Sequence, residues 1–181
     1  MPNKITYMPF AKFIDYLTLE KKYAAHTITA YTTDLESFLQ FASEEFDYKD
    51  IKSVNYSIIR SWIVALVDAN VSNRSINRKI SSLRSYYKFL LKTKQIEVSP
   101  LAKHKALKTS KKIQVPFSEK EIEQVLTLLE EADGFEGIRN KLIVELFYST
   151  GMRRAELVNL KVDAVSIAQR TIKVLGKRNK E

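Results

Sequence analysis

Apolar residues in the first half of the chain recur at helical spacing and predict a bundle of amphipathic helices. Polar joints at 46–52 and 70–73 separate the apolar sets, and no stretch before residue 100 alternates as a strand would. We therefore expect a bundle of about four helices over residues 1–97. The apolar sets are Phe10, Phe13, Ile14 and Leu17; Ile28, Tyr31, Leu35, Phe38 and Leu39; Ile58, Trp62, Ile63 and Leu66; and Ile76, Ile80, Leu83, Tyr87 and Leu90.

The fourth predicted helix, at about residues 74–91, carries a polar stripe opposite its apolar one. At 100° per residue the opposite side holds cations and small hydroxyls without an acidic residue, namely Arg74, Arg78, Ser81, Ser85 and Lys88. Arg and Lys bind phosphates or guanines, and Ser binds phosphates. The stripe is suited to a DNA groove, although a charged outer face is also the ordinary state of a solvated helix.

A basic segment at residues 98–117 follows the bundle. It contains Pro100 and Pro116 and no acidic residue, and it is predicted to be a linker because so many lysines with few apolar neighbours do not build a core. Its lysines are Lys103, Lys105, Lys108, Lys111 and Lys112. A basic linker would run along a phosphate backbone and help to clamp a duplex, each neutralised phosphate adding salt-sensitive affinity. A plain flexible tether is the alternative.

A second domain is predicted from Ser118 onward. Ser118 and Glu121 have the spacing of a capping box at the start of a helix. Another apolar helix, at 142–148, ends before Gly151, and a further helix starts with Arg153 in its first turn. Residues 165–167 and 171–175 then alternate like the strands of a small hairpin. The fold class is therefore mainly α, with the helical start of a mixed α+β domain.

Charge is concentrated in the middle of the chain. The 181 residues carry a net charge of +9. Residues 60–112 hold 13 basic and 2 acidic side chains, against 6 and 8 before them and 11 and 11 after them. Such a block favours a polyanionic partner over mere solubility.

Composition excludes several classes of function. With 0 Cys and 2 His there is no thiol chemistry and little material for a zinc site, so we expect no metal. The N-terminus lacks a signal-peptide pattern and no apolar run reaches membrane-spanning length, which favours a soluble cytoplasmic protein without a membrane partner.

Several segments resemble the tyrosine recombinase (Xer/phage integrase) family. FYSTGMRRAELVNLK followed by IKVLGKRNKE resembles its Tyr-x-Thr-Gly-hydrophobic-Arg-x-x-Glu-Leu box and Gly-Lys-x-x-Lys hairpin. HTITAYTTDLESFLQF and NRSINRKISSLRSYYKFLLKTKQIEVSPL resemble its N-terminal core-binding domain, a SAM-like bundle. The resemblance implies a core-binding domain at 1–97, a basic linker at 98–117 and part of a catalytic domain at 118–181.

The resemblance also implies a chemistry. In this family a tyrosine hydroxyl attacks a DNA phosphodiester and forms a 3′-phosphotyrosine, without a cofactor. Arg153 aligns with the first catalytic arginine, which neutralises phosphoryl oxygens, and Lys177 aligns with the hairpin lysine, a general acid. Glu156 aligns with a glutamate that supports the arginine, and Thr150 and Gly151 form the turn that directs it.

The remaining catalytic residues of the family, a second arginine, a further His or Trp and the nucleophilic tyrosine, would follow the hairpin. All nine tyrosines instead precede Arg153: Tyr7, Tyr16, Tyr23, Tyr31, Tyr48, Tyr56, Tyr86, Tyr87 and Tyr148. We therefore expect a truncated chain that binds DNA as a monomer, supplies part of an active site and does not cleave unaided. We also expect the second domain to be the less stable one.

The parent protein would act as a tetramer on inverted-repeat sites. Because the core-binding pattern begins almost at Met1, a Xer-like enzyme of chromosome partition and cell division is favoured over a mobile-element integrase, which often has an additional domain first. A non-catalytic DNA-binding module is a further alternative. A basic protein that binds RNA or membranes ranks lowest, because no aromatic platform or strongly apolar outer face is evident.

Overall fold

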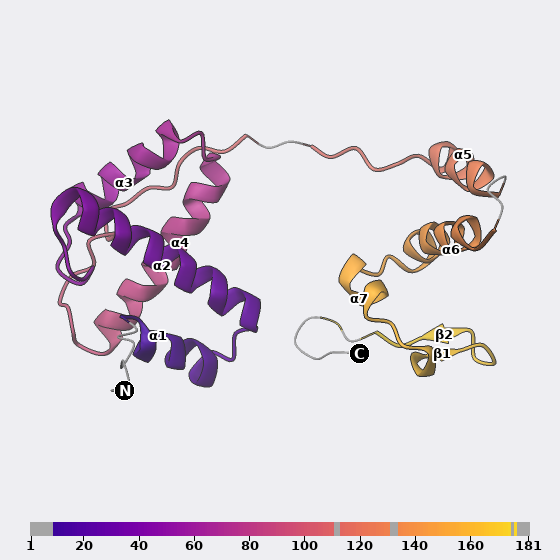
Figure 1. The fold of residues 1–181 in the computed structure, drawn as a ribbon, viewed down its shortest axis with the longest axis horizontal. Coiled ribbons are helices and arrows are strands. Elements are labelled where there is room, and N and C mark those ends of the chain that lie inside the picture. The colour runs from indigo at the N-terminus through magenta and orange to yellow at the C-terminus, as the bar shows by residue number, and fades with distance from the viewer. Residues whose placement is uncertain (1–8, 111–112, 131–133, 175, 177–181) are drawn as a thin grey trace, which may run out of the picture. The chain divides into compact units, whose positions relative to one another are not determined.

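The computed structural model describes residues 9–110, 113–130, 134–174 and 176. The chain forms two compact units, Met1–Lys111 and Lys112–Glu181, which are described separately below. Both are built mainly from helices, and the second also contains a small antiparallel sheet (Figure 1). This confirms the mainly α fold class. In the described part of the chain, no helix combines the length and the apolar character needed to cross a membrane.

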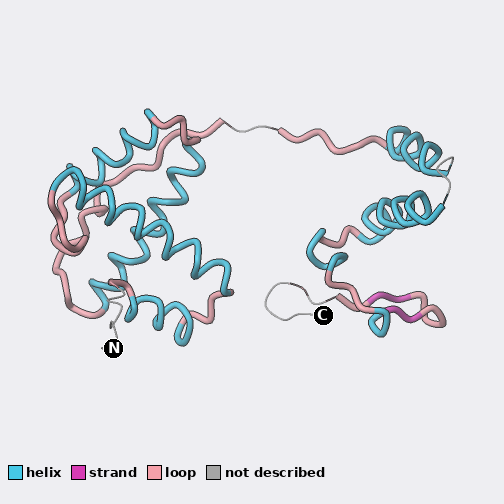
Figure 2. Tube along the Cα trace, viewed as in Figure 1, coloured by secondary structure: helices cyan, strands magenta, loops and turns pink. Residues whose placement is uncertain are grey.

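The first unit is a helical bundle, as the apolar periodicity predicts. Its elements are α1 (Ala11–Asp15), continued by a π-helical turn η1 (Tyr16–Glu20), then α2 (Ala25–Phe46), α3 (Tyr56–Asp68) and α4 (Asn73–Lys92) (Figure 2). Two of the starts have side-chain caps. Asn55 Oδ1 accepts a hydrogen bond from the Ser57 amide at 2.9 Å, and Ser72 Oγ accepts one from the Ser75 amide at 3.2 Å.

The core of the first unit contains the predicted apolar positions, together with further residues such as Ile59, Tyr86 and Phe89. Members of all four sets are either fully buried or packed against the buried cluster. Aromatic rings are central to it: the Phe38 and Trp62 ring centroids lie 5.0 Å apart. The buried Tyr87 hydroxyl donates a 2.7 Å hydrogen bond to the Ile51 carbonyl, so this phenol ties α4 to the loop between α2 and α3.

The first part of the predicted basic linker, residues 98–110, packs on the bundle and is therefore not the plain flexible tether that was the alternative. We call residues 98–110 the strap. Leu101 is 3% exposed and belongs to the core, and Leu107 packs against it. Asn77 both donates to the Leu107 carbonyl and accepts from its amide, each at 2.9 Å, and Asn73 donates to the Lys108 carbonyl at 2.8 Å. Two leucines and two asparagines thus contribute to the docking of a lysine-rich segment.

The second unit begins with two helices, α5 (Glu119–Glu130) and α6 (Gly134–Thr150). The capping box at the start of α5 is confirmed, because Glu121 Oε2 accepts from the Ser118 amide at 2.7 Å and Ser118 Oγ accepts from the Glu121 amide at 3.3 Å. Lys141 Nζ lies 2.6 Å from Glu130 Oε1 and joins α6 to the end of α5.

A short helix and a hairpin complete the described part of the second unit. They are α7 (Arg154–Val158), the 3-10 turn η2 (Val162–Ala164), β1 (Val165–Ser166) and β2 (Thr171–Ile172). The strands are antiparallel, with Val165 opposite Ile172 and Ser166 opposite Thr171. The hairpin is the predicted one, with shorter strands than the alternation indicated.

Candidate functional site

The polar stripe of α4 faces outward from the bundle. Ile76, Ile80, Leu83, Tyr87 and Leu90 are buried on the opposite side, as the helical wheel predicts. Arg74, Ser81 and Lys88 are exposed, whereas Ser85 is half-buried and Ser81 Oγ donates to the Asn77 carbonyl of its own helix. The stripe therefore presents cations to solvent at both of its ends.

Arg78 is not a free cation of the stripe, because an acidic residue of α2 reaches it. The sequence predicts a stripe without an acidic neighbour. Asp34 of α2 is 1% exposed, and its carboxylate accepts from Arg78 Nη1 at 2.7 Å and Nη2 at 2.9 Å. Lys79 Nζ and Ser82 Oγ also donate to it, at 3.2 Å and 2.7 Å. Four donors are what a buried carboxylate needs to offset its desolvation. Arg78 is thus part of a network that joins α2 to α4.

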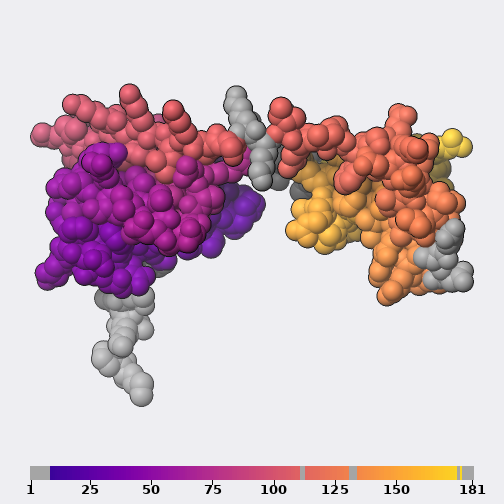
Figure 3. All heavy atoms as spheres, turned by 90° about the horizontal axis from the view of Figure 1, so that it is seen from above, coloured from indigo at the N-terminus to yellow at the C-terminus, as the bar shows by residue number. Residues whose placement is uncertain are grey.

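Asn73 and Asn77 hold the strap against α4, whereas Arg78 and Ser82 contact α2 from the other side of the stripe. Figure 3 shows the atoms of the strap in a row along one side of the first unit. Asn73 and Asn77, which hold it, stand about 80° from the centre of the stripe on the helical wheel. Lys103, Lys105 and Lys108 are exposed on it. The other two lysines proposed to bind DNA, Lys111 and Lys112, lie outside the described residues.

A histidine contact fixes the middle of the strap. Tyr56 Oη at the start of α3 lies 3.0 Å from His104 Nδ1, while His104 Nε2 is buried without a hydrogen-bond partner in the described chain. Burial, and secondarily the positive Arg84, lower the pKa of His104 below its usual value of 6.5. The histidine is therefore neutral when the strap is docked at neutral pH.

In the second unit, the turn between α6 and α7 directs Arg153. Gly151 has a φ of 63°, a left-handed conformation that glycine adopts without strain, and its amide bonds to the Phe147 carbonyl. Thr150 Oγ1 bonds to the Leu146 carbonyl and accepts from the Met152 amide at 3.3 Å. The chain then reverses so that Arg153 occupies the N-cap position of α7.

Arg153 and Glu156 form a closed pair. The Glu156 carboxylate accepts from the Arg153 amide at 2.7 Å with one oxygen and from its guanidinium with the other. These two bonds lower the pKa of Glu156, the bond to the amide being the larger cause. The Arg153 side chain remains 69% exposed. One edge of its guanidinium is thus held while the rest faces solvent.

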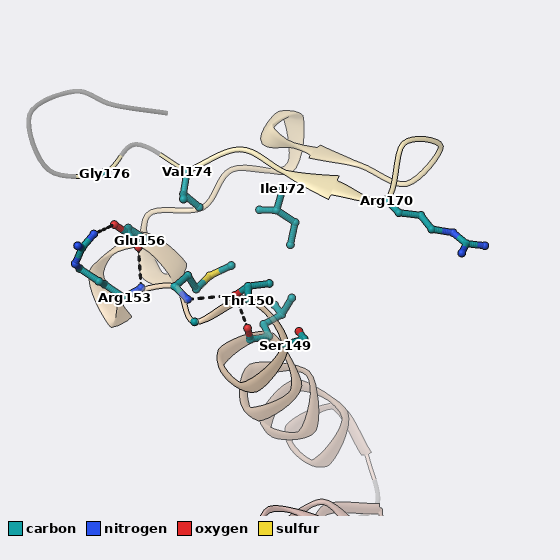
Figure 4. A pocket seen from close by; sticks show the side chains of 11 residues that line it. Ser149, Thr150, Arg153, Glu156, Arg170, Ile172, Val174 and Gly176 are labelled. Carbon is teal, nitrogen blue, oxygen red and sulfur yellow. Dashed lines mark hydrogen bonds and ion pairs between the residues drawn. The ribbon is translucent and has the colours of Figure 1, made fainter. Parts of the chain in front are cut away.

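The pair borders a hollow of about 580 Å³. Thr150 and Gly151 line it from the turn, and Ile172 and Val174 from the hairpin (Figure 4). Arg170 also borders it, but its side chain extends away from Arg153. The arrangement brings Thr150, Gly151, Arg153 and Glu156 together, and Lys177, the expected partner of Arg153, lies outside the described residues.

Sequence reasoning missed the residues that position the cations of the first unit. They are Asp34, Asn73, Asn77 and the Tyr56–His104 pair. The role of Asp34 could have been predicted from the sequence. Asp34 lies within the helical series Tyr31, Leu35 and Phe38, so its carboxylate faces the neighbouring helix and needs a buried partner. No such indication exists in the sequence for Asn73 and Asn77, because asparagines on the polar side of a helix are common.

Comparison with known proteins finds a family match for each of the two units. Residues 10–94 match the phage integrase N-terminal SAM-like domain, and residues 118–181 match the phage integrase family. Tyrosine recombinases XerC from Pediococcus pentosaceus and Anoxybacillus flavithermus are 36% and 37% identical over 93% of this chain and 56% of their own length. The XerC of Leptospira interrogans serovar copenhageni is 38% identical over 94% and 55%.

The chain thus spans little more than half the length of these relatives. No solved structure matches it. With both of its units matched, and with the turn, arginine and glutamate of the second unit brought together, the chain belongs to the phage integrase family of tyrosine recombinases.

Proposed function

We propose that the first unit binds double-stranded DNA through a basic face made of Arg74, Arg78, Lys88, Lys103, Lys105 and Lys108. The observation that carries the proposal is the docking of the strap beside the outward stripe of α4, which holds lysines and arginines from two segments on one unit. Docking lowers the entropy lost when these cations meet phosphates. Lys111 and Lys112 extend the same run of charge in the sequence.

The second unit supplies part of the recombinase active site under the same proposal. Arg153, with one edge of its guanidinium held by Glu156, is suited to neutralise the non-bridging oxygens of a phosphodiester as charge builds up. Lys177 is the proposed general acid for the leaving 5′-oxygen. The tyrosine nucleophile is not among the nine tyrosines of this sequence, so the chain alone forms no 3′-phosphotyrosine.

The biological role that we propose is Xer-type site-specific recombination, in which a tetramer of the full-length protein acts on inverted repeats during chromosome partition at cell division. The support is that relatives matched over nearly the whole of this chain are named tyrosine recombinase XerC. Integration of a mobile element is the alternative within the same family.

Binding to a short labelled duplex of mixed sequence across a salt series tests the DNA-binding proposal. The variant Lys103→Ala with Lys105→Ala and Lys108→Ala should bind more weakly, and the slope of log K against log salt should fall by about 0.9 for each phosphate that is no longer neutralised. A matched variant replaces three exposed lysines elsewhere on the same unit, Lys12, Lys49 and Lys52, by alanine. Equal losses of affinity in the two variants would contradict a defined basic face.

A denaturing gel of the chain mixed with the same duplex tests the catalytic proposal. We expect no band in which protein and DNA remain covalently joined. A covalent band that survives denaturation and disappears on substitution of one of the nine tyrosines would show that the nucleophile lies within this sequence.

A further inference from the structure

The Asp34 network is the strongest feature that the proposed function leaves unused. A buried carboxylate with a single arginine partner would cancel the charge of that arginine. Here Lys79 Nζ shares the carboxylate at 3.2 Å, so one acid faces two cations and the cluster keeps a net positive charge. Lys79 is only 18% exposed, whereas the Arg78 side chain is 53% exposed. The surplus charge is therefore accessible from solvent through Arg78.

The geometry of the pair leaves Arg78 with donors to spare. Its two terminal nitrogens each give one hydrogen to Asp34, at 2.7 Å and 2.9 Å. A guanidinium has five N–H groups in one plane, so three remain. Among the described residues no other acceptor is bonded to them. Two bonds to a buried partner fix the plane of the guanidinium, and with it the direction of the remaining donors.

We propose that Asp34 is a positioning residue for DNA binding, which fixes Arg78 so that its remaining N–H donors meet a phosphate or a base edge of the duplex. This inference rests on the proposed binding of DNA by the first unit. Arg78 stands one turn from Arg74 and on the same exposed side of α4. An arginine ordered in advance loses less side-chain entropy on binding than one that is free in solvent.

The proposal makes a prediction opposite in sign to that of overall charge. Asp34→Asn removes a negative charge, so a purely electrostatic account expects tighter binding to DNA. If Asp34 instead positions Arg78, the substitution should weaken binding to DNA. Glu20→Gln is a matched control, since it removes an acid that also pairs with a lysine of α4, Lys92, at 2.7 Å on an exposed part of the same unit.

The experiment measures the affinity of the full chain for a short labelled mixed-sequence duplex by fluorescence anisotropy at fixed salt. We expect Asp34→Asn and the charge-conserving Arg78→Lys each to weaken binding roughly fivefold or more, the lower end of the cost of removing an arginine that binds DNA. Glu20→Gln should bind as tightly as the unaltered chain or more tightly. Thermal unfolding followed by circular dichroism checks that each variant is folded.

A double variant separates positioning from a general structural role. If Asp34 acts through Arg78, adding Asp34→Asn to Arg78→Ala should cause no further loss of affinity. A further loss in the double variant would overturn the proposal, as would Asp34→Asn binding as tightly as Glu20→Gln. If Asp34→Asn does not fold, unchanged binding by Arg78→Lys would overturn it. An unaltered chain that binds no DNA would instead overturn the proposed function, and the inference with it.

Discussion

The two units place their apolar side chains in opposite ways. In the first unit every helix contributes buried residues, and Leu35, Phe38, Ile76 and Leu83 are fully enclosed. In the described part of the second unit no apolar side chain is buried, and large ones such as Leu128 at 67% and Ile138 at 71% are exposed. A similar apolar content thus produces a core in one unit and open faces in the other.

Helix α6 shows what this difference means. Its apolar residues occur on all sides of the helix, a pattern typical of a helix at the centre of a core. The described residues cover it only in part. The first unit therefore encloses its apolar residues, and we expect the second unit, whose described apolar side chains are open, to be the less stable of the two.

Hydrogen exchange should reveal the largest difference between the units. Slowly exchanging amides in α2–α4 should be protected at least about 100-fold more than those in α5–α7, a gap of about 2.8 kcal/mol in opening free energy. Mass spectrometry of peptic fragments after exchange in the intact chain measures this directly. Similar protection in the two units would show that the second unit is stable by itself.

A matched pair of leucine substitutions tests whether the apolar side chains of the two units differ in burial. Leu83→Ala leaves a cavity at a fully buried site and should cost about 3–5 kcal/mol. Leu128→Ala, at a largely exposed site, should cost less than about 0.5 kcal/mol. Urea unfolding followed by circular dichroism measures both, and fluorescence of the single tryptophan, Trp62, reports the first unit separately. Comparable costs would indicate that the face of α5 around Leu128 is covered in solution.

The strap offers a smaller test within the first unit. Asn77→Ala removes the donor and the acceptor that hold Leu107 and should cost about 1–2 kcal/mol. Asn159→Ala, which removes one exposed bond between the C-cap residue of α7 and the Ala155 carbonyl, should have little effect. Exchange of the Leu107 amide should accelerate selectively in the first variant. If that amide is equally protected in both variants, docking of the strap does not depend on Asn77.

Acidification should affect the two units at different pH values. His104 has a lowered pKa, so its contribution to docking is complete above pH 6.5 and is lost as the pH falls from there through its folded value. Glu121 and Glu156 have pKa values lowered by their capping bonds, and their contributions are complete above pH 4.5 and lost below it. Titration followed by NMR should therefore show changes in the strap first and at the starts of α5 and α7 later. The opposite order would contradict these assignments.

The sequence predicted the helices and the core of the first unit because a helix packed on one side repeats its apolar residues every 3.6 positions. Its resemblance to the tyrosine recombinase family also led to Arg153, Glu156 and the turn at Gly151, which the spacing alone would not have singled out. It did not predict the docking of the strap or the partner of Arg78. Both depend on which helix surfaces meet, since Asp34 lies 44 positions before Arg78 and Asn77 lies 30 before Leu107. Periodicity within one helix contains no such information.

The outward stripe of α4 and the docked strap are proposed to form one DNA-binding face. Amide chemical shifts of the isotope-labelled chain, recorded as a short duplex is added, show which residues the duplex contacts. We predict the largest shifts at Arg74, Arg78 and Ser81 and at residues 103–108, diminishing as salt is raised. Shifts confined to α1 and to the loop between α2 and α3, or no shifts at low salt, would contradict this proposal.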